Sequence, residues 1–193
     1  VQIGRLTASA RTVEFVSENL KGQKVSVPEV VSRLGNVTFS GEAGGAGNAL
    51  STRGILQTDA GTARLLLGLH DRKFSAHVET AGIALGKLLN SPKLGTIAAN
   101  ISAKGTLHQG RTPDVKAHGT VNSIDWNGYT YRNINIDGLY AGGTLKGQLG
   151  MDDPNGEINV KGLLSSGKGK PRMNLAATIA HLNPSALGLT HKY

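Results

Sequence analysis

The chain has 193 residues, of which 27 are glycine and only 4% are aromatic, so it holds little bulk for the densely packed centre of a compact enzyme. It contains no cysteine, which excludes disulfides, thiolate catalysis and cysteine metal sites. The formal net charge of +8 comes from 21 scattered lysines and arginines, and no basic helix or aromatic-and-basic strand indicates nucleic-acid binding.

The N-terminal part of the chain begins in a strand-like pattern and then changes to helical spacing. Residues 13–20 and 27–34 are apolar on one side and are expected to form short helical turns, the second with Pro28 at its first position. Residues 85–89 and 183–187 predict two further helical turns. Each is too short to be stable alone, so we expect these turns to pack over an end or an edge of a sheet.

From residue 34 onward the dominant signal is alternation of apolar and polar residues, which places successive side chains on opposite faces of a strand. It is clearest in residues 73–79, 115–121, 133–137, 144–149, 157–161 and 174–179. Asn127-Gly128 lies between two such runs and predicts a tight hairpin, because both residues tolerate a positive φ. The pattern predicts an up-and-down meander of roughly eleven or twelve strands.

A flat sheet of that many strands would be roughly 50 to 60 Å wide at about 4.8 Å per strand, so we expect it to curl. Small residues at inward positions, such as Gly119, Gly147, Ala76 and Ala117, favour bending and leave space over the apolar face. We predict a mostly β fold: a long curved antiparallel sheet, shaped as a half-pipe with an apolar groove, with a few short helices. The alternative is an ordinary sandwich with a dry centre.

The chain is expected to form a single elongated β domain over residues 1–193, as an internal fragment of a larger protein. Two stretches within it are similar: residues 34–41 and residues 94–100 both begin with Leu-Gly and both follow a helical turn. This similarity predicts two loosely related units, at about 34–92 and 94–187, stacked in one continuous sheet.

The candidate functional residues are the large apolar side chains that the alternation places on the inward face of the sheet. An aligned stripe of such side chains is suited to hydrocarbon, whereas each residue taken alone is equally suited to an ordinary core. The predicted groove lining consists of Phe39, Leu65, Leu67, Phe74, Val78, Ile97, Ile101, Val115, Val121, Ile134, Ile136, Leu145, Leu149, Ile158, Val160, Leu175 and Ile179.

Several motifs, taken in their order along the chain, resemble the TamB family of envelope proteins, which includes the AsmA-related lipid-transfer proteins. The motifs are residues 34–41, residues 85–89, the hairpin with its following strand at residues 126–134, and the Asp-Asp-Pro-Asn-Gly turn at residues 152–156. The version that the chain resembles is the one found in Bacteroides-type bacteria. The resemblance covers nearly the whole chain.

This resemblance implies a half-pipe sheet, or β-taco, within a large protein that is anchored in the inner membrane and crosses the periplasm. It implies a non-enzymatic apolar conduit that transfers phospholipid between the inner and outer membranes or assists outer-membrane protein assembly. The implied partners are phospholipid acyl chains and, through regions outside this chain, an outer-membrane barrel protein. The alternative function is a structural or adhesive β scaffold that spans the periplasm and carries no lipid.

Other kinds of site are not indicated. The six histidines do not combine helical spacing with a third ligand, and the Asp152, Asp153 and Asn155 cluster lacks the full calcium-loop pattern. No nucleophile, base and orienting acid follow a recognisable signature, so we expect no enzyme activity, no metal and no cofactor. Exposed sheet edges are expected to allow self-association.

Overall fold

The computed structural model describes residues 2–9, 33–165 and 171–190, with side chains from residue 33 onward. Eleven strands form one antiparallel sheet in which each strand pairs with its neighbours in the sequence. The strands are β1 (Gln2–Ser9), β2 (Asn36–Ala46), β3 (Ala49–Thr58), β4 (Gly61–His70), β5 (Lys73–Ala84), β6 (Leu94–His108), β7 (Arg111–Trp126), β8 (Tyr129–Ala141), β9 (Thr144–Asp153), β10 (Gly156–Ser165) and β11 (Arg172–Leu182). One helix, α3 (Leu85–Leu89), connects β5 to β6.

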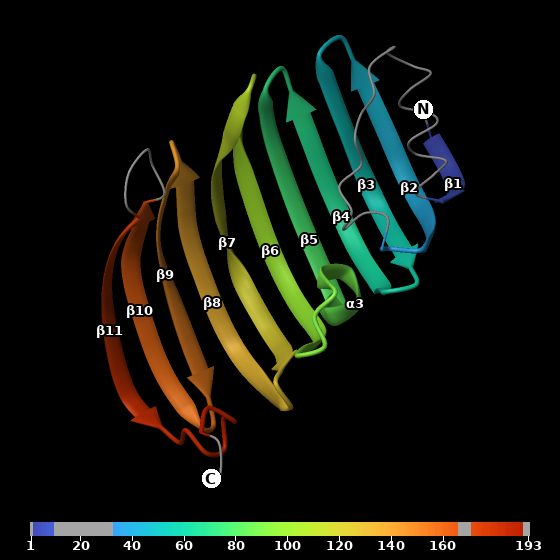
Figure 1. The fold of residues 1–193 in the computed structure, drawn as a ribbon. Coiled ribbons are helices and arrows are strands. Elements are labelled where there is room, and N and C mark those ends of the chain that lie inside the picture. Colours follow the sequence, from blue (N-terminus) through green and yellow to red (C-terminus); the bar gives the residue numbers. More distant parts are fainter. Residues whose placement is uncertain (1, 10–32, 166–170, 191–193) are drawn as a thin grey trace.

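The predicted fold class is therefore confirmed: the protein is mostly β, with a long, curved antiparallel sheet that does not close on itself (Figure 1). The order of the strands in the sheet is their order in the chain, as the meander predicts. The hairpin at Asn127-Gly128 is present, and both residues have positive φ, 52° and 84°. This is the backbone twist that matches a two-residue turn to its flanking strands.

The helical turns fall partly within the described residues. Helix α3 spans residues 85–89, as predicted. Residues 183–187 form a turn that is closed by a hydrogen bond from the Leu187 amide to the Asn183 carbonyl, 3.1 Å long. The expected turn at residues 13–20 and most of the one at 27–34 lie outside the described residues.

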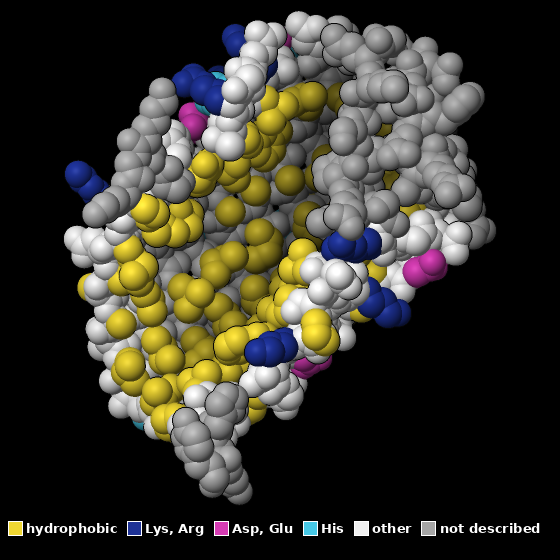
Figure 2. Space-filling model, in the orientation of Figure 1, with side chains coloured by type: hydrophobic (Ala, Val, Ile, Leu, Met, Phe, Trp, Pro, Cys, Tyr) yellow, Lys and Arg dark blue, Asp and Glu magenta, His cyan; other side chains and the backbone are white. Residues whose placement is uncertain are grey.

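The strand register sorts the side chains into an apolar face and a polar face. Directly paired residues of antiparallel strands point to the same side of a sheet, so a row of partners can be followed from strand to strand. One such row runs Ile101, Gly119, Ile136, Leu149 and Val160. Figure 2 shows a face that is hollowed and lined by hydrophobic side chains. We call this the concave face, and the opposite side the convex face.

The packed core lies at one set of strand ends, along a border of the curved sheet that we call the capped edge. Helix α3 and residues 183–189 both lie at this edge (Figure 1). There Leu187 is only 1% exposed and packs with Tyr131 and Met151, and Leu88 of α3 is also buried. Among the described residues, the opposite edge, which we call the open edge, contains the hairpin turns at 46–49, 70–73, 108–111 and 141–144.

The two similar stretches begin their strands with the same contact. The amide of Asn36 donates to Asp59 Oδ2 over 3.0 Å, and the amide of Thr96 donates to Asp125 Oδ2 over 3.1 Å. In each case the preceding glycine packs so closely against the aspartate that a Cβ atom would clash with it. A carboxylate therefore holds the first residues of both β2 and β6: Asp59 from the turn after β3, and Asp125 from the end of β7. The division into two units stays a prediction.

Candidate functional site

All seventeen predicted lining residues lie on the concave face. The register shows this strand by strand: Phe39 pairs with Leu56, Leu65 with Val78, and Val78 with Ile101. The same face continues through β8 to β11, where Ile158 pairs with Met151 and Ile179. None of the seventeen is fully buried. The sheet therefore brings these side chains onto one surface that keeps contact with solvent.

The concave face of β7 to β11 contains an open hollow of about 470 Å³. Six of its lining residues were predicted from the alternation. Four further large apolar ones, Tyr140, Leu163, Leu164 and Met173, were not. The sequence carried a signal for two of them. Leu164 lies four residues after Val160 and Met173 lies two residues before Leu175, so each continues the alternation of a predicted residue on the same face. The predicted residues in the hollow are Val115, Ile136, Leu145, Leu149, Val160 and Leu175.

The walls of this hollow are apolar, and several of their side chains are exposed. Leu145 is 46% exposed, Leu175 54% and Met173 68%. Burying one side chain of this size is worth roughly 1.5–3 kcal/mol, so leaving several in water on one surface is costly to a folded chain. A contiguous apolar surface of this kind indicates a site that binds hydrocarbon or another apolar surface.

The floor of the hollow is formed by small residues. A single row crosses the concave face from β6 to β10 and consists of Ala103, Ala117, Gly138, Gly147 and Gly162, and all of these except Ala103 line the hollow. A Cβ atom placed on Gly138 would meet only Leu145 Cδ1 at 3.8 Å and the Lys146 carbonyl at 3.9 Å, both ordinary contact distances. The space above Gly138 is therefore empty, whereas a Cβ atom on Gly119 or Gly147, which the sequence named as leaving space, would meet a backbone oxygen at 2.2 Å or 2.5 Å.

Elsewhere on the same face, large side chains lie across the glycines. The ring of Phe74 lies against Gly105 on the neighbouring strand, and the ring of Phe39 lies against Gly41 and Gly54. Leu175 covers Gly162 in the same way. These side chains occupy the space over the glycines beside them, whereas the nearest side-chain atom to a Cβ on Gly138 would be Leu145 Cδ1 at 3.8 Å.

Two predicted lining residues have a different role. Ile134 and Ile158 pack against the cluster of Tyr131, Met151 and Leu187 at the capped edge. The turn at residues 183–189 lies over this part of the face, and Tyr131 donates a hydrogen bond to the Leu187 carbonyl, 2.8 Å long. Ile134 and Ile158 therefore contribute to the packed core next to the hollow and do not line it.

The polar groups at the capped edge are satisfied within the protein. Asp153 is only 1% exposed and accepts hydrogen bonds from the Tyr129 hydroxyl, the Arg132 amide (3.0 Å) and the Asn155 amide (2.9 Å). Hydrogen bonds from the Thr130 hydroxyl (2.6 Å) and from the Thr96 amide lower the pKa of Asp125. Both carboxylates hold the strand ends together, and neither faces the hollow.

The described residues show no metal cluster: no three histidine, aspartate or glutamate side chains come together among them in a way that could hold an ion. No helix in the described parts of the chain is long and apolar enough to cross a membrane. No family model matches the chain, and no curated protein or solved structure matches it significantly.

Proposed function

We propose that the concave face is a conduit for the acyl chains of phospholipids, in an envelope protein of the TamB type located in the periplasm and anchored in the inner membrane. The observation that supports this most is the open apolar hollow over Gly138 and Gly147, bordered by exposed leucines. An ordinary sandwich would cover these side chains with a second sheet, and the described residues form only one sheet.

The dimensions of the face suit a lipid tail. Five strands, β7 to β11, border the hollow. At about 4.8 Å per step they span roughly 19 Å across the sheet, somewhat more than the roughly 15 Å depth of one leaflet of hydrocarbon. Because the two inner rows of this face consist only of apolar and small residues, a tail lying across the strands meets no charge.

The physical chemistry of the face favours movement over tight capture. Each methylene withdrawn from water is worth about 0.8 kcal/mol, so a tail leaves a bilayer only for a surface that is nearly as apolar. Contacts with aliphatic side chains are not directional, so a tail can slide along them over small barriers while its headgroup stays in water. The direction of transport and the energy for it come from outside this face.

Site-specific photo-crosslinking tests the proposal. A photoreactive phenylalanine analogue placed at Ile136 should capture phospholipid from vesicles or cells, and the same analogue at the convex-face residue Asn159 should not. In the complete protein, Ile136→Asp and Val160→Glu should block lipid passage while the sheet still forms. Equal crosslinking at positions 136 and 159 would instead favour a scaffold without lipid cargo.

A further inference from the structure

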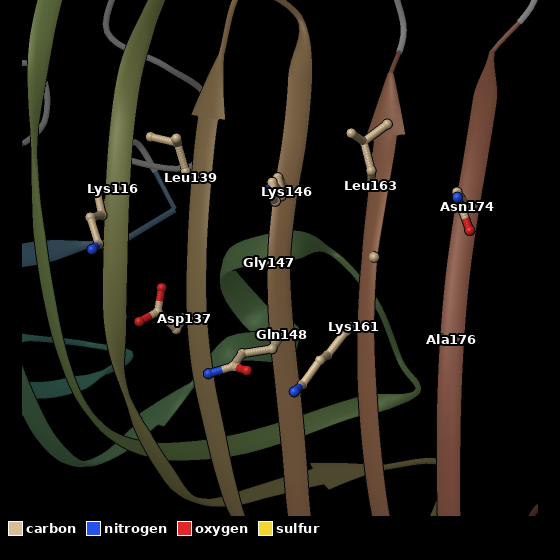
Figure 3. Close-up of a pocket in the computed structure, with 11 residues that line it drawn as sticks. Lys116, Asp137, Leu139, Lys146, Gly147, Gln148, Lys161, Leu163, Asn174 and Ala176 are labelled. Carbon is tan, nitrogen blue, oxygen red and sulfur yellow. The ribbon is translucent and has the colours of Figure 1, made fainter.

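The convex face carries an unneutralised group of lysines. Lys116 of β7, Lys146 of β9 and Lys161 of β10 border an open hollow of about 610 Å³, together with Asp137 and Gln148 (Figure 3). Within the described residues, none of these three lysines forms an ion pair or a side-chain hydrogen bond. Lys104 of β6 pairs directly with Lys116 in the register, and like charges directly opposite one another destabilise a sheet.

The cationic residues at the other end of the convex face behave differently. Arg53 of β3 forms an ion pair with Glu42 over 3.1 Å, and Arg64 of β4 forms one with Glu79 over 2.9 Å. These arginines are neutralised by the strand beside them. Lys104, Lys116, Lys146 and Lys161 therefore differ from Arg53 and Arg64 in forming no ion pair within the described residues.

Exposed leucines alternate with the lysines across the strands. The register gives one row of partners, Lys116, Leu139, Lys146 and Leu163, in which every second residue is leucine. Leu139 is 46% exposed and Leu163 37%, although both lie on the polar side of the sheet. Figure 3 shows this row side by side on adjacent strands. Ile55 and Leu66 are exposed beside the paired arginines of the same face, so the feature that distinguishes this row is the combination of exposed leucines with lysines that form no ion pair.

We propose that this row of the convex face, together with Lys104, docks onto the surface of an anionic phospholipid bilayer. The lysines contact the headgroup phosphates, and Leu139 and Leu163 enter the boundary between headgroups and acyl chains. The interfacial zone of a membrane presents negative charge and apolar contact within a few ångströms, which matches the alternation. The row spans four strand spacings, roughly 19 Å, so several lipids are touched at once. This surface lies opposite the proposed conduit and does not depend on it.

Vesicle co-sedimentation of the 193-residue chain tests the charge. Binding should occur to vesicles of mixed phosphatidylcholine and phosphatidylglycerol and be weak to pure phosphatidylcholine. The double variant Lys116→Gln and Lys146→Gln should lower the partition coefficient about 25-fold, because each lysine near an anionic surface contributes about fivefold. The matched control, Lys87→Gln with Lys93→Gln, removes the same charge at the capped edge and should leave binding close to that of the unmodified chain.

The leucines distinguish a membrane from a soluble polyanion. Leu139→Asn with Leu163→Asn should weaken vesicle binding by about tenfold, since two apolar insertions are lost, whereas Ile55→Asn with Leu66→Asn at the other end of the face should not. Heparin binding should be unaffected by the leucine variant. The proposal is overturned if the lysine variant binds vesicles as well as its control does. It is also overturned if the leucine variant binds vesicles as well as the unmodified chain does and heparin competes fully with the vesicles.

Gly138→Leu, which fills the concave hollow, should leave vesicle docking unchanged, so failure of the conduit and failure of this surface give different results.

Discussion

The capped edge and the open edge of the sheet use the same kinds of residue with opposite results. At the capped edge, α3 and the turn at 183–189 lie over the strand ends and bury Leu88 and Leu187. At the open edge, Leu50 and Leu145 lie next to the hairpin turns and are exposed. The comparison teaches that alternation alone produces an apolar face, and that a few residues of turn decide which part of it becomes a core and which part stays available to a ligand.

Truncation of the core at the capped edge should have the largest effect. Leu187→Ala removes a side chain that is 1% exposed and packed against Tyr131 and Met151, so it should lower the free energy of unfolding by about 3 kcal/mol. Leu145→Ala, at the open edge, should cost less than about 1 kcal/mol because its side chain is already partly in water. Urea denaturation measures both. Equal losses would contradict the distinction between the two edges.

Two aspartates, Asp153 at the capped edge and Asp114 near the open edge, should contribute very different amounts to the stability of the sheet. Asp153→Ala leaves the amides of Arg132 and Asn155 and the hydroxyl of Tyr129 without an acceptor, so it should cost about 2 kcal/mol of stability. Asp114 near the open edge pairs with the His108 ring over 2.9 Å on the surface of the protein, and Asp114→Ala should leave the urea midpoint nearly unchanged. A larger loss at Asp114 than at Asp153 would mean that the open edge is the one that stabilises the sheet.

Lowering the pH should reduce the stability of the capped edge by less than the core and Asp153 substitutions do. The hydrogen bonds from Thr130 and Thr96 lower the pKa of Asp125 in the folded state below its ordinary value of 3.8. A lowered pKa means that the stabilisation is fully present above the unfolded pKa and is lost as the pH falls through the folded one. Stability should therefore fall below about pH 4, and Asp125→Asn should reduce the acid dependence in urea titrations. An unchanged slope in the variant would exclude this contribution.

The sequence predicts which face of the sheet a side chain occupies much better than whether that side chain is packed into the core. Alternation in residues 133–137 and 157–161 places Ile136 and Val160 correctly because the period of two is local and the strands are long. The packing of Ile134 and Ile158 into the core depends on a turn that begins more than twenty residues after Ile158 in the chain. No local pattern reports where such a turn docks.

The convex lysines show a second limit of sequence reasoning. Lys104 and Lys116 are separated along the chain, and they become direct partners only through the register of β6 and β7, which contains several shifts. Each bulge moves every later pair by one position, so a cross-strand neighbour cannot be assigned without knowing where the bulges fall. Scattered charge in the sequence is therefore compatible with local grouping on the folded surface.

Occupation of the concave hollow by a side chain is the most direct test of the conduit. Gly138→Leu should fold with little change in stability, since its Cβ meets only ordinary contacts, and its side chain should fill the space over Gly147. Displacing as few as two methylenes of a bound tail costs about 1.6 kcal/mol, so binding of a fluorescent acyl probe should weaken about tenfold or more. Ser51→Leu on the convex face of β3 should bind as the unmodified chain does. Equal affinity of all three proteins would contradict the conduit.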